Sequence, residues 1–175
     1  MPTAIYPGTF DPVHNGHIDI ATRAAGIFEH LTMAIYARPM KSLLFSVEER
    51  KAMIEEAMAG VPNISVATYN QLTVDFARQL GAQVIVRGLR VISDFELEFQ
   101  MALTNKKLDP GIEVVCLMTS QEYAFISAST VKEIVMLGGC VDGMVPPQVA
   151  EAMEAKFRGL DSEGQSSVRL VSLRD

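Results

Sequence analysis

The chain has 175 residues, of which 49% are hydrophobic and 21% are charged, as expected for a globular domain with a sizeable core. Its formal net charge of −6 argues against broad nucleic-acid binding and leaves any anion site to a few local basic side chains. No apolar stretch has the length of a membrane span, the N-terminus lacks a signal-peptide pattern, and the two cysteines form no metal or redox motif. We therefore expect one folded domain in the cytoplasm, without a membrane or nucleic-acid partner.

The stretch over residues 4–17 has the pattern of a buried strand, a tight loop and the start of a helix. The strand is expected to stop at Pro7, because proline cannot continue a hydrogen-bonded ladder and a glycine follows it. Thr9, His14 and His17 would then lie at the mouth of the helix, where unpaired N–H groups attract anions. A charged or donor imidazole there suits a phosphate, so the spacing predicts a phosphate site.

A metal site is the alternative for the same stretch, with His14 and His17 as ligands and Asp11 as a third. A structural zinc site usually has four ligands, often cysteines, and no cysteine lies near these residues. The phosphate site is therefore preferred, and no protein-held metal is predicted.

Short apolar runs without polar alternation alternate with helical patterns along the rest of the chain. Such runs are typical of strands buried on both faces of a parallel sheet, with helices as the connections. The fold predicted is therefore α/β, a Rossmann-like parallel five-stranded sheet with helices on both faces. The further strands are expected at 31–37, 64–67, 83–86 and 113–118, and the further helices at about 46–59, 72–80, 92–107, 130–137 and 148–157. There is no Gly-x-Gly-x-x-Gly run and no P-loop lysine.

Two arginines, Arg87 and Arg90, are expected directly after the fourth strand, on either side of Gly88. Ligands of open parallel sheets bind beyond the carboxyl ends of the strands, and a guanidinium offers forked donors to phosphate oxygens. This pair therefore predicts a second phosphate contact. In the next helix, an apolar stripe runs along one side, and Asp94 and Glu98 lie on a neighbouring face, where pairing with Arg90 is the simplest role for Asp94.

A cluster of hydroxyl side chains precedes the helix that contains Glu133. Thr130 and Glu133 fit a capping box, which makes Thr130 the expected first cap of this helix. Ser127 and Ser129 exceed what one cap needs, so the cluster predicts a further phosphate cradle built from side chains and backbone N–H groups.

Two motifs of the N-terminal stretch carry a resemblance to a known family. Residues 8–12, Gly-Thr-Phe-Asp-Pro, and residues 14–17, His-Asn-Gly-His, resemble the signature of the HxGH nucleotidylyltransferases, and within them the bacterial phosphopantetheine adenylyltransferases. The resemblance covers residues 1–157, taken as the nucleotidylyltransferase domain. Residues 158–175 form a C-terminal extension whose composition favours flexibility.

The resemblance implies adenylyl transfer from ATP to 4'-phosphopantetheine, giving dephospho-coenzyme A and pyrophosphate in coenzyme A biosynthesis. It makes His17 the group that stabilises the transition state. By the same resemblance the acceptor is bound by Thr9, Lys41, Thr73 and Arg87. ATP is contacted by Thr9, Phe10, His17, Gly88, Leu89, Arg90, Glu98, Tyr123, Ala124, Phe125, Ile126, Ser127, Ala128 and Ser129. The family usually has a serine where Ala128 stands, so one hydroxyl contact is absent here while the backbone cradle remains.

The resemblance also implies a homohexamer, and it brings Mg²⁺ as an ion carried on ATP rather than in a protein cage. Two other functions stay open on the sequence. One is another transferase of the superfamily, such as a nicotinate mononucleotide enzyme, and the other is a nucleotide sensor without turnover. The run of residues 87–90 and the form of residues 126–129 argue against the first, and the retained His17 and Lys41 argue against the second.

Overall fold

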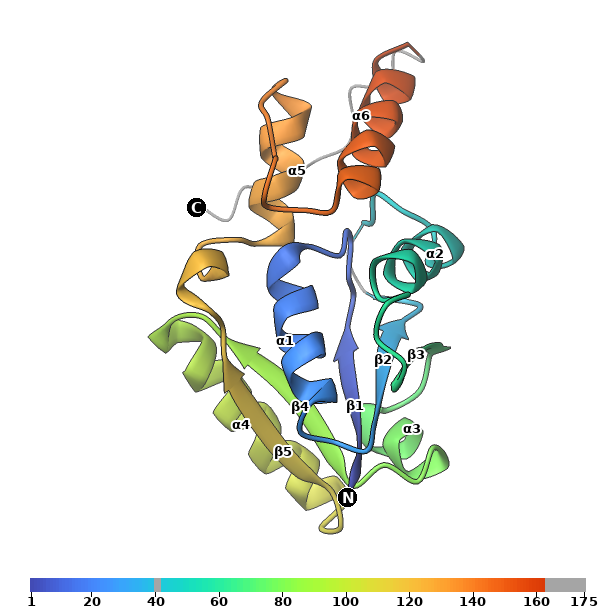
Figure 1. Ribbon diagram of the computed structural model, residues 1–175. Helices are drawn as coiled ribbons and strands as arrows, with labels where there is room; N and C mark the ends of the chain where they lie inside the picture. Colours follow the sequence, from blue (N-terminus) through green and yellow to red (C-terminus); the bar gives the residue numbers. More distant parts are fainter. Residues whose placement is uncertain (40–41, 163–175) are drawn as a thin grey trace.

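The structure, a computed structural model, describes residues 1–39 and 42–162 (Figure 1). Strands and helices alternate along most of the chain, and two helices follow the last strand. In chain order the elements are β1 Thr3–Gly8, α1 Asn15–Ala25, β2 His30–Tyr36, α2 Val47–Ala57, β3 Ile64–Tyr69, α3 Thr73–Gln79, β4 Val84–Leu89, α4 Ile92–Leu108, β5 Glu113–Met118, the 3-10 turn η1 Gln121–Tyr123, α5 Ala128–Met136 and α6 Pro147–Ser162.

The five strands form one sheet in the order β3-β2-β1-β4-β5, and every neighbouring pair is parallel. The predicted Rossmann-like parallel sheet is confirmed. Its central strands β1, β2 and β4 are largely buried, because successive side chains point to opposite faces and helices cover both, whereas the edge strands β3 and β5 are mostly half-buried or exposed. On one face Tyr6 and Val86 pack in a cluster with Ile20 of α1, and on the other Ile5 and Ile85 pack in a second cluster with residues of α3. Figure 1 shows α1 in front of the sheet and α4 behind β4 and β5.

The sheet opens at its carboxyl edge between β1 and β4. These strands pair only at Ala4 and Ile5, whereas β1 continues beside β2 through Pro7 and Gly8. The prediction that the strand stops at Pro7 is therefore wrong. In a strand the N and the carbonyl of one residue point to the same side, and the Pro7 carbonyl faces Arg87 of β4. The N–H that proline lacks would therefore have pointed toward β4 and not toward β2, so the pairing of β1 with β2 is unaffected. A cleft begins on the β4 side, at the topological switch point.

Two other predicted boundaries are corrected. β4 runs to Leu89, so Arg87 and Gly88 belong to the end of the strand instead of following it. α6 begins at Pro147 and continues to Ser162, past residue 157, where this last helix was expected to end. Residues 163–175, most of the expected extension, lie outside the described part of the chain.

The apolar stripe predicted on α4 does not enter the core. Ile92 exposes 84% of its surface, and Phe95 and Phe99 expose 54% each while their rings stack 5.8 Å apart. The helix packs on β4 and β5, yet a row of large apolar side chains remains on the surface of the single chain. None of the helices in residues 1–39 and 42–162 is long and apolar enough to cross a membrane.

Candidate active site

Two adjoining cavities open at the cleft between β1 and β4. The first, which we call the histidine cavity, has a volume of about 380 Å³, and the second, the tyrosine cavity, about 390 Å³. The histidine cavity is lined by Tyr6, Pro7, Gly8, Thr9, Phe10, Asp11, His14, Gly16, His17, Ile20, Arg87, Gly88, Arg90, Asp94, Glu98, Thr119, Tyr123, Ser127, Ala128, Ser129 and Lys132. The tyrosine cavity is lined by Pro7, Gly8, Thr9, Tyr36, Tyr69, Gln71, Leu72, Thr73, Ile85, Arg87, Glu98, Met101, Ala102, Asn105 and Val114. The residues common to both are Pro7, Gly8, Thr9, Arg87 and Glu98.

The loop after β1 has a strained backbone at Phe10, whose φ of 52° lies in the left-handed region. The Phe10 ring folds back over Gly8, where a Cβ atom would lie only 2.8 Å from the ring. Gly8 is therefore needed for the space that it leaves. The Phe10 ring meets the His17 ring edge-on, with centroids 4.9 Å apart, and so holds the imidazole from one side.

His17 lies in the first turn of α1 and is held as a neutral donor. Its Nδ1 accepts a hydrogen bond of 3.2 Å from the backbone N–H of His14, so the ring proton is on Nε2. Burial, together with the positive charges that His14, Arg90 and Arg87 would present, holds the pKa of His17 well below its ordinary value. Of the two states considered for this imidazole, charged and neutral, its surroundings thus favour the neutral donor.

His14 stacks on His17 with the ring centroids 3.6 Å apart. Burial, helped by Arg90, lowers the pKa of His14 to about 4. Its Nδ1 is buried without a hydrogen-bond partner, and among the described residues no other buried side-chain N or O atom is in that state. Gly16 leaves room for this ring, since a Cβ atom there would lie 3.2 Å from it.

The Asp11 carboxylate, in the wall of the histidine cavity, connects three segments of the chain. Its carboxylate accepts hydrogen bonds from the backbone N–H groups of Leu44 and Phe45, at 3.0 and 2.9 Å, and from Nζ of Lys132 on α5 at 2.9 Å. Asp11 is 2% exposed and Lys132 9%, so this is a buried ion pair with further hydrogen bonds. The sequence-based prediction treated Asp11 only as a possible metal ligand and did not include Lys132.

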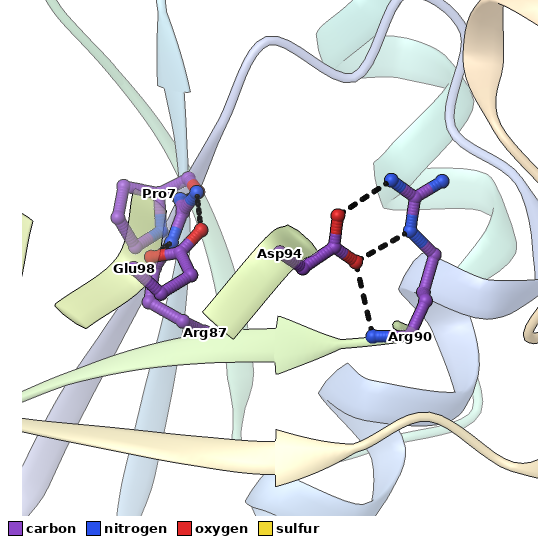
Figure 2. A network of polar contacts seen from close by, with 5 residues as sticks. All are labelled: Pro7, Arg87, Arg90, Asp94 and Glu98. Carbon is purple, nitrogen blue, oxygen red and sulfur yellow. Dashed lines mark hydrogen bonds and ion pairs between the residues drawn. The ribbon is translucent and has the colours of Figure 1, made fainter. Parts of the chain in front are cut away.

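Two arginine–carboxylate pairs line the other side of the cleft (Figure 2). Nε and Nη2 of Arg87 donate to the two oxygens of Glu98 at 2.7 and 2.6 Å, and Nη1 donates to the Pro7 carbonyl at 2.8 Å. Arg90 pairs with Asp94 through Nε and Nη2, at 3.0 and 3.1 Å, as predicted for Asp94. Burial works against the charge of Arg87, yet Glu98 outweighs it and raises the pKa of that guanidinium.

The N-terminus of α5 faces the histidine cavity, but its cap differs from the predicted one. Ser127 is the N-cap and accepts a hydrogen bond of 3.1 Å from the N–H of Thr130, so Thr130 lies inside the helix. The capping-box motif led to the wrong residue because Ser127 is equally able to cap and comes three residues earlier. Ser127, Ala128 and Ser129 line the cavity with backbone at a helix start, as a phosphate cradle requires.

The structure brings most of the predicted site residues together. Thr9, Phe10, His17, Arg87, Gly88, Arg90, Glu98, Tyr123, Ser127, Ala128 and Ser129 line the histidine cavity, and Thr73 lines the tyrosine cavity. Leu89, Ala124, Phe125 and Ile126 line neither. Phe125 is 66% exposed and Ile126 is 1% exposed within the core, although its carbonyl accepts a hydrogen bond from Arg90. Lys41 lies outside the described residues.

Sequence reasoning missed the walls of the tyrosine cavity. Tyr36 and Tyr69 end β2 and β3, and Leu72 directly precedes α3. The rule that ligands bind beyond strand ends, which found Arg87, would have found these residues as well.

No group of three or more His, Cys, Asp or Glu side chains within residues 1–39 and 42–162 is placed to hold a metal ion. The acidic side chains of the histidine cavity are instead engaged by cations, Asp11 by Lys132, Asp94 by Arg90 and Glu98 by Arg87.

Most of the chain matches known proteins in sequence. Residues 5–134 match the cytidylyltransferase-like family. Phosphopantetheine adenylyltransferases from Carboxydothermus hydrogenoformans and Thermomicrobium roseum are each 52% identical, over 90% and 91% of this chain and 98% of theirs. The enzyme of Desulforudis audaxviator is 49% identical over 94% of this chain and its whole length.

A solved structure, of a candidate nicotinate-nucleotide adenylyltransferase from Vibrio parahaemolyticus, superposes with a TM-score of 0.66 over 87% of this chain and 99% of that one. At 15% identity this likeness concerns the fold alone. The extent of the sequence identity decides the closer relationship, and the chain belongs to the phosphopantetheine adenylyltransferase family, with a cytidylyltransferase-like domain.

Proposed function

We infer that the chain is a pantetheine-phosphate adenylyltransferase of coenzyme A biosynthesis, which transfers an adenylyl group from ATP to 4'-phosphopantetheine. The products are dephospho-coenzyme A and pyrophosphate. Family membership at about half identity over nine-tenths of the chain supports this function.

The observation that carries the inference within the molecule is the meeting of two cavities beside His17. The reaction joins two large substrates, and it needs their reacting phosphates at one point. The cavities share Thr9 and Arg87, both expected to hold the acceptor. Thr73, the third expected acceptor contact, belongs to the tyrosine cavity, whose walls mix apolar and amide side chains as the pantetheine arm requires.

In the proposed reaction an oxygen of the acceptor phosphate attacks the α-phosphorus of ATP in line. A P–O bond forms there as the bond to the departing pyrophosphate breaks, and no covalent enzyme intermediate is formed. The neutral His17 donates its Nε2 proton in a hydrogen bond to phosphate oxygens whose charge grows in the transition state. Its low pKa means that it acts as a donor dipole rather than as a fixed charge.

The remaining residues bind and orient. Arg90, Lys132 and the start of α5 supply donors for the nucleotide phosphates within the histidine cavity. MgATP is the proposed form of the nucleotide, with the ion on the triphosphate. Lys41 stays a proposed acceptor contact, made on the family resemblance alone.

We further propose a homohexamer in the cytoplasm. The support for self-association is the exposed apolar row on α4, which an isolated soluble domain rarely leaves uncovered. The cytoplasmic location rests on the family and its pathway.

The test is a choice of acceptors. Purified protein with MgATP is given 4'-phosphopantetheine, nicotinate mononucleotide or glycerol phosphate, and pyrophosphate release is followed. We expect release with 4'-phosphopantetheine only. Release with another acceptor alone would reject the inference, and so would the absence of release with all three.

A further inference from the structure

An ion pair whose two residues line both cavities is formed by Arg87 at the end of β4 and Glu98 on α4. We propose that Glu98 is a positioning residue, which holds the Arg87 guanidinium in the orientation that receives the acceptor phosphate. The proposal rests on the proposed function, because it concerns the acceptor of that reaction.

The Arg87 guanidinium is held by Glu98 and by the Pro7 carbonyl and keeps N–H groups free for a ligand. Each carboxylate oxygen of Glu98 accepts from a different nitrogen of Arg87, at 2.7 and 2.6 Å, and the Pro7 carbonyl takes a third N–H at 2.8 Å (Figure 2). These three contacts use three of the five N–H donors of a guanidinium. The other two remain for a ligand, so a phosphate can bind Arg87 without displacing Glu98.

The partial burial of the pair and the lack of other side-chain partners among the described residues make the orientation of Arg87 depend on Glu98. The side chain of Glu98 is 13% exposed and that of Arg87 34%, so the pair is partly withdrawn from water, where a bidentate contact is stronger than at the surface. Arg87 has no other side-chain partner among the described contacts. Without Glu98, only the Pro7 carbonyl would hold a long, flexible side chain, which would have to be ordered when the phosphate binds.

The family resemblance assigns Glu98 to ATP, and the geometry adds a different role. Both oxygens of the carboxylate are engaged by Arg87, and both residues line the two cavities. A residue that only contacted ATP would change ATP binding when it is replaced. A residue that acts through Arg87 changes acceptor binding, and its effect depends on whether Arg87 is intact.

The decisive variant is Glu98→Gln, which keeps the shape of the side chain but removes its charge and one of the two acceptors. Glu96→Gln is the matched control, since it removes the same charge from an exposed position two residues away on α4 and outside both cavities. Calorimetric titration with 4'-phosphopantetheine, without ATP, should show a Kd about tenfold weaker for Glu98→Gln, as expected for about 1.4 kcal/mol of lost charge-assisted contact. Glu96→Gln should bind as the wild type does.

A double-mutant cycle tests whether Glu98 acts through Arg87. Arg87→Lys keeps the charge and loses the fork. In that background Glu98→Gln should weaken acceptor binding less than twofold further, because the contact that it removes is already absent. The KM for ATP should change much less than the KM for the acceptor in the single Glu98→Gln variant.

Unchanged acceptor binding in Glu98→Gln would overturn the proposal, as would a full tenfold loss in the Arg87→Lys background. A rise confined to the KM for ATP would also overturn it and leave Glu98 as an ATP contact. The titration needs no turnover. A wild-type protein that forms no dephospho-coenzyme A would therefore reject the proposed function by a separate measurement.

Discussion

Nζ of Lys132, on α5, lies 2.9 Å from Oδ2 of Asp11, in the loop after β1, and both side chains are buried. The sequence separates these residues by most of the domain, and the ion pair joins two segments that both line the histidine cavity. The backbone N–H groups of Leu44 and Phe45 complete the shell of the carboxylate. The pair thus fixes the walls of the cavity as well as the core beneath it.

Removing the cation of this pair should destabilise the fold. Lys132→Met leaves Asp11 charged and buried with only its two backbone donors, at an expected cost of about 3 kcal/mol. Lys156→Met is the control, because Lys156 also pairs with a carboxylate, Glu49, but both side chains are more than a third exposed, and its loss should cost less than about 1 kcal/mol. Urea unfolding at one protein concentration measures both. Equal losses of unfolding free energy in the two variants would show that burial of the Lys132–Asp11 pair adds nothing to stability.

Replacing His17 by alanine should reduce turnover by roughly 10² or more, as for other donors used in a transition state. The Kd for ATP should change little, and the fold should be kept with a modest fall in the unfolding midpoint, because the imidazole makes a single hydrogen bond to the protein among the described contacts, the one that it accepts from the His14 N–H. His30→Ala, on β2 and outside both cavities, is the control and should keep normal turnover. Near-normal turnover in His17→Ala would exclude the role given to this residue.

Acid should destabilise the protein through His14. Its pKa of about 4 lies below the ordinary 6.5, so between these values the folded state binds fewer protons than the unfolded state. The stability is complete above about pH 6.5 and falls as the pH approaches 4, by about 3 kcal/mol in all. His14→Gln cannot take up this proton, and its urea midpoint should depend less steeply on pH. Parallel curves for the two proteins would contradict the assignment.

The apolar row on α4 should be needed for assembly. A charge at Phe99, which is 54% exposed and stacks on Phe95, would have to be buried in a subunit contact. Phe99→Glu should therefore sediment as smaller species than the wild type. Ile27→Glu places the same charge at a lone exposed apolar residue, 51% exposed in the turn after α1, and should leave the assembly unchanged. If both variants sediment as the wild type does, α4 is not the contact surface.

Truncation after Ser162 should preserve both the proposed hexamer and the activity, because residues 1–157 already span the family resemblance. The measurement is sedimentation and turnover of the truncated and complete chains side by side. Dissociation of the truncated protein to monomers would make the C-terminal residues an assembly element.

Features that depend on local pattern could be predicted from the sequence. β5 was predicted at its observed bounds because an uninterrupted apolar run between a turn and a polar segment has few other solutions. His17 and Arg87 were found because a helix start and a strand end are local features with a known chemistry. The exposure of α4 was not predictable, since an apolar stripe looks the same whether its own core or another copy covers it.

Contacts between distant segments were out of reach. Lys132 follows a helix cap like many surface lysines, and only the folded chain places it against Asp11. Pro7 was predicted to end the strand because a proline lacks the N–H that a neighbouring strand would bind. The sequence does not tell that this N–H would have faced β4, while the pairing with β2 continues. The pairing of Arg87 with Glu98 likewise depends on how α4 lies across β4.

The uncovered side chains of α4 also bear on how the protein behaves when it is dilute. The proposed assembly would take Ile92, Phe95 and Phe99 out of water and so stabilise the folded chain, and the melting temperature is therefore expected to rise with protein concentration instead of being a constant of the chain. Newly made subunits would pass through a stage in which this surface is open and prone to aggregation. The yield of active enzyme on refolding is therefore expected to depend on how quickly partners are found, with an optimum between too few copies to assemble and too many to stay in solution.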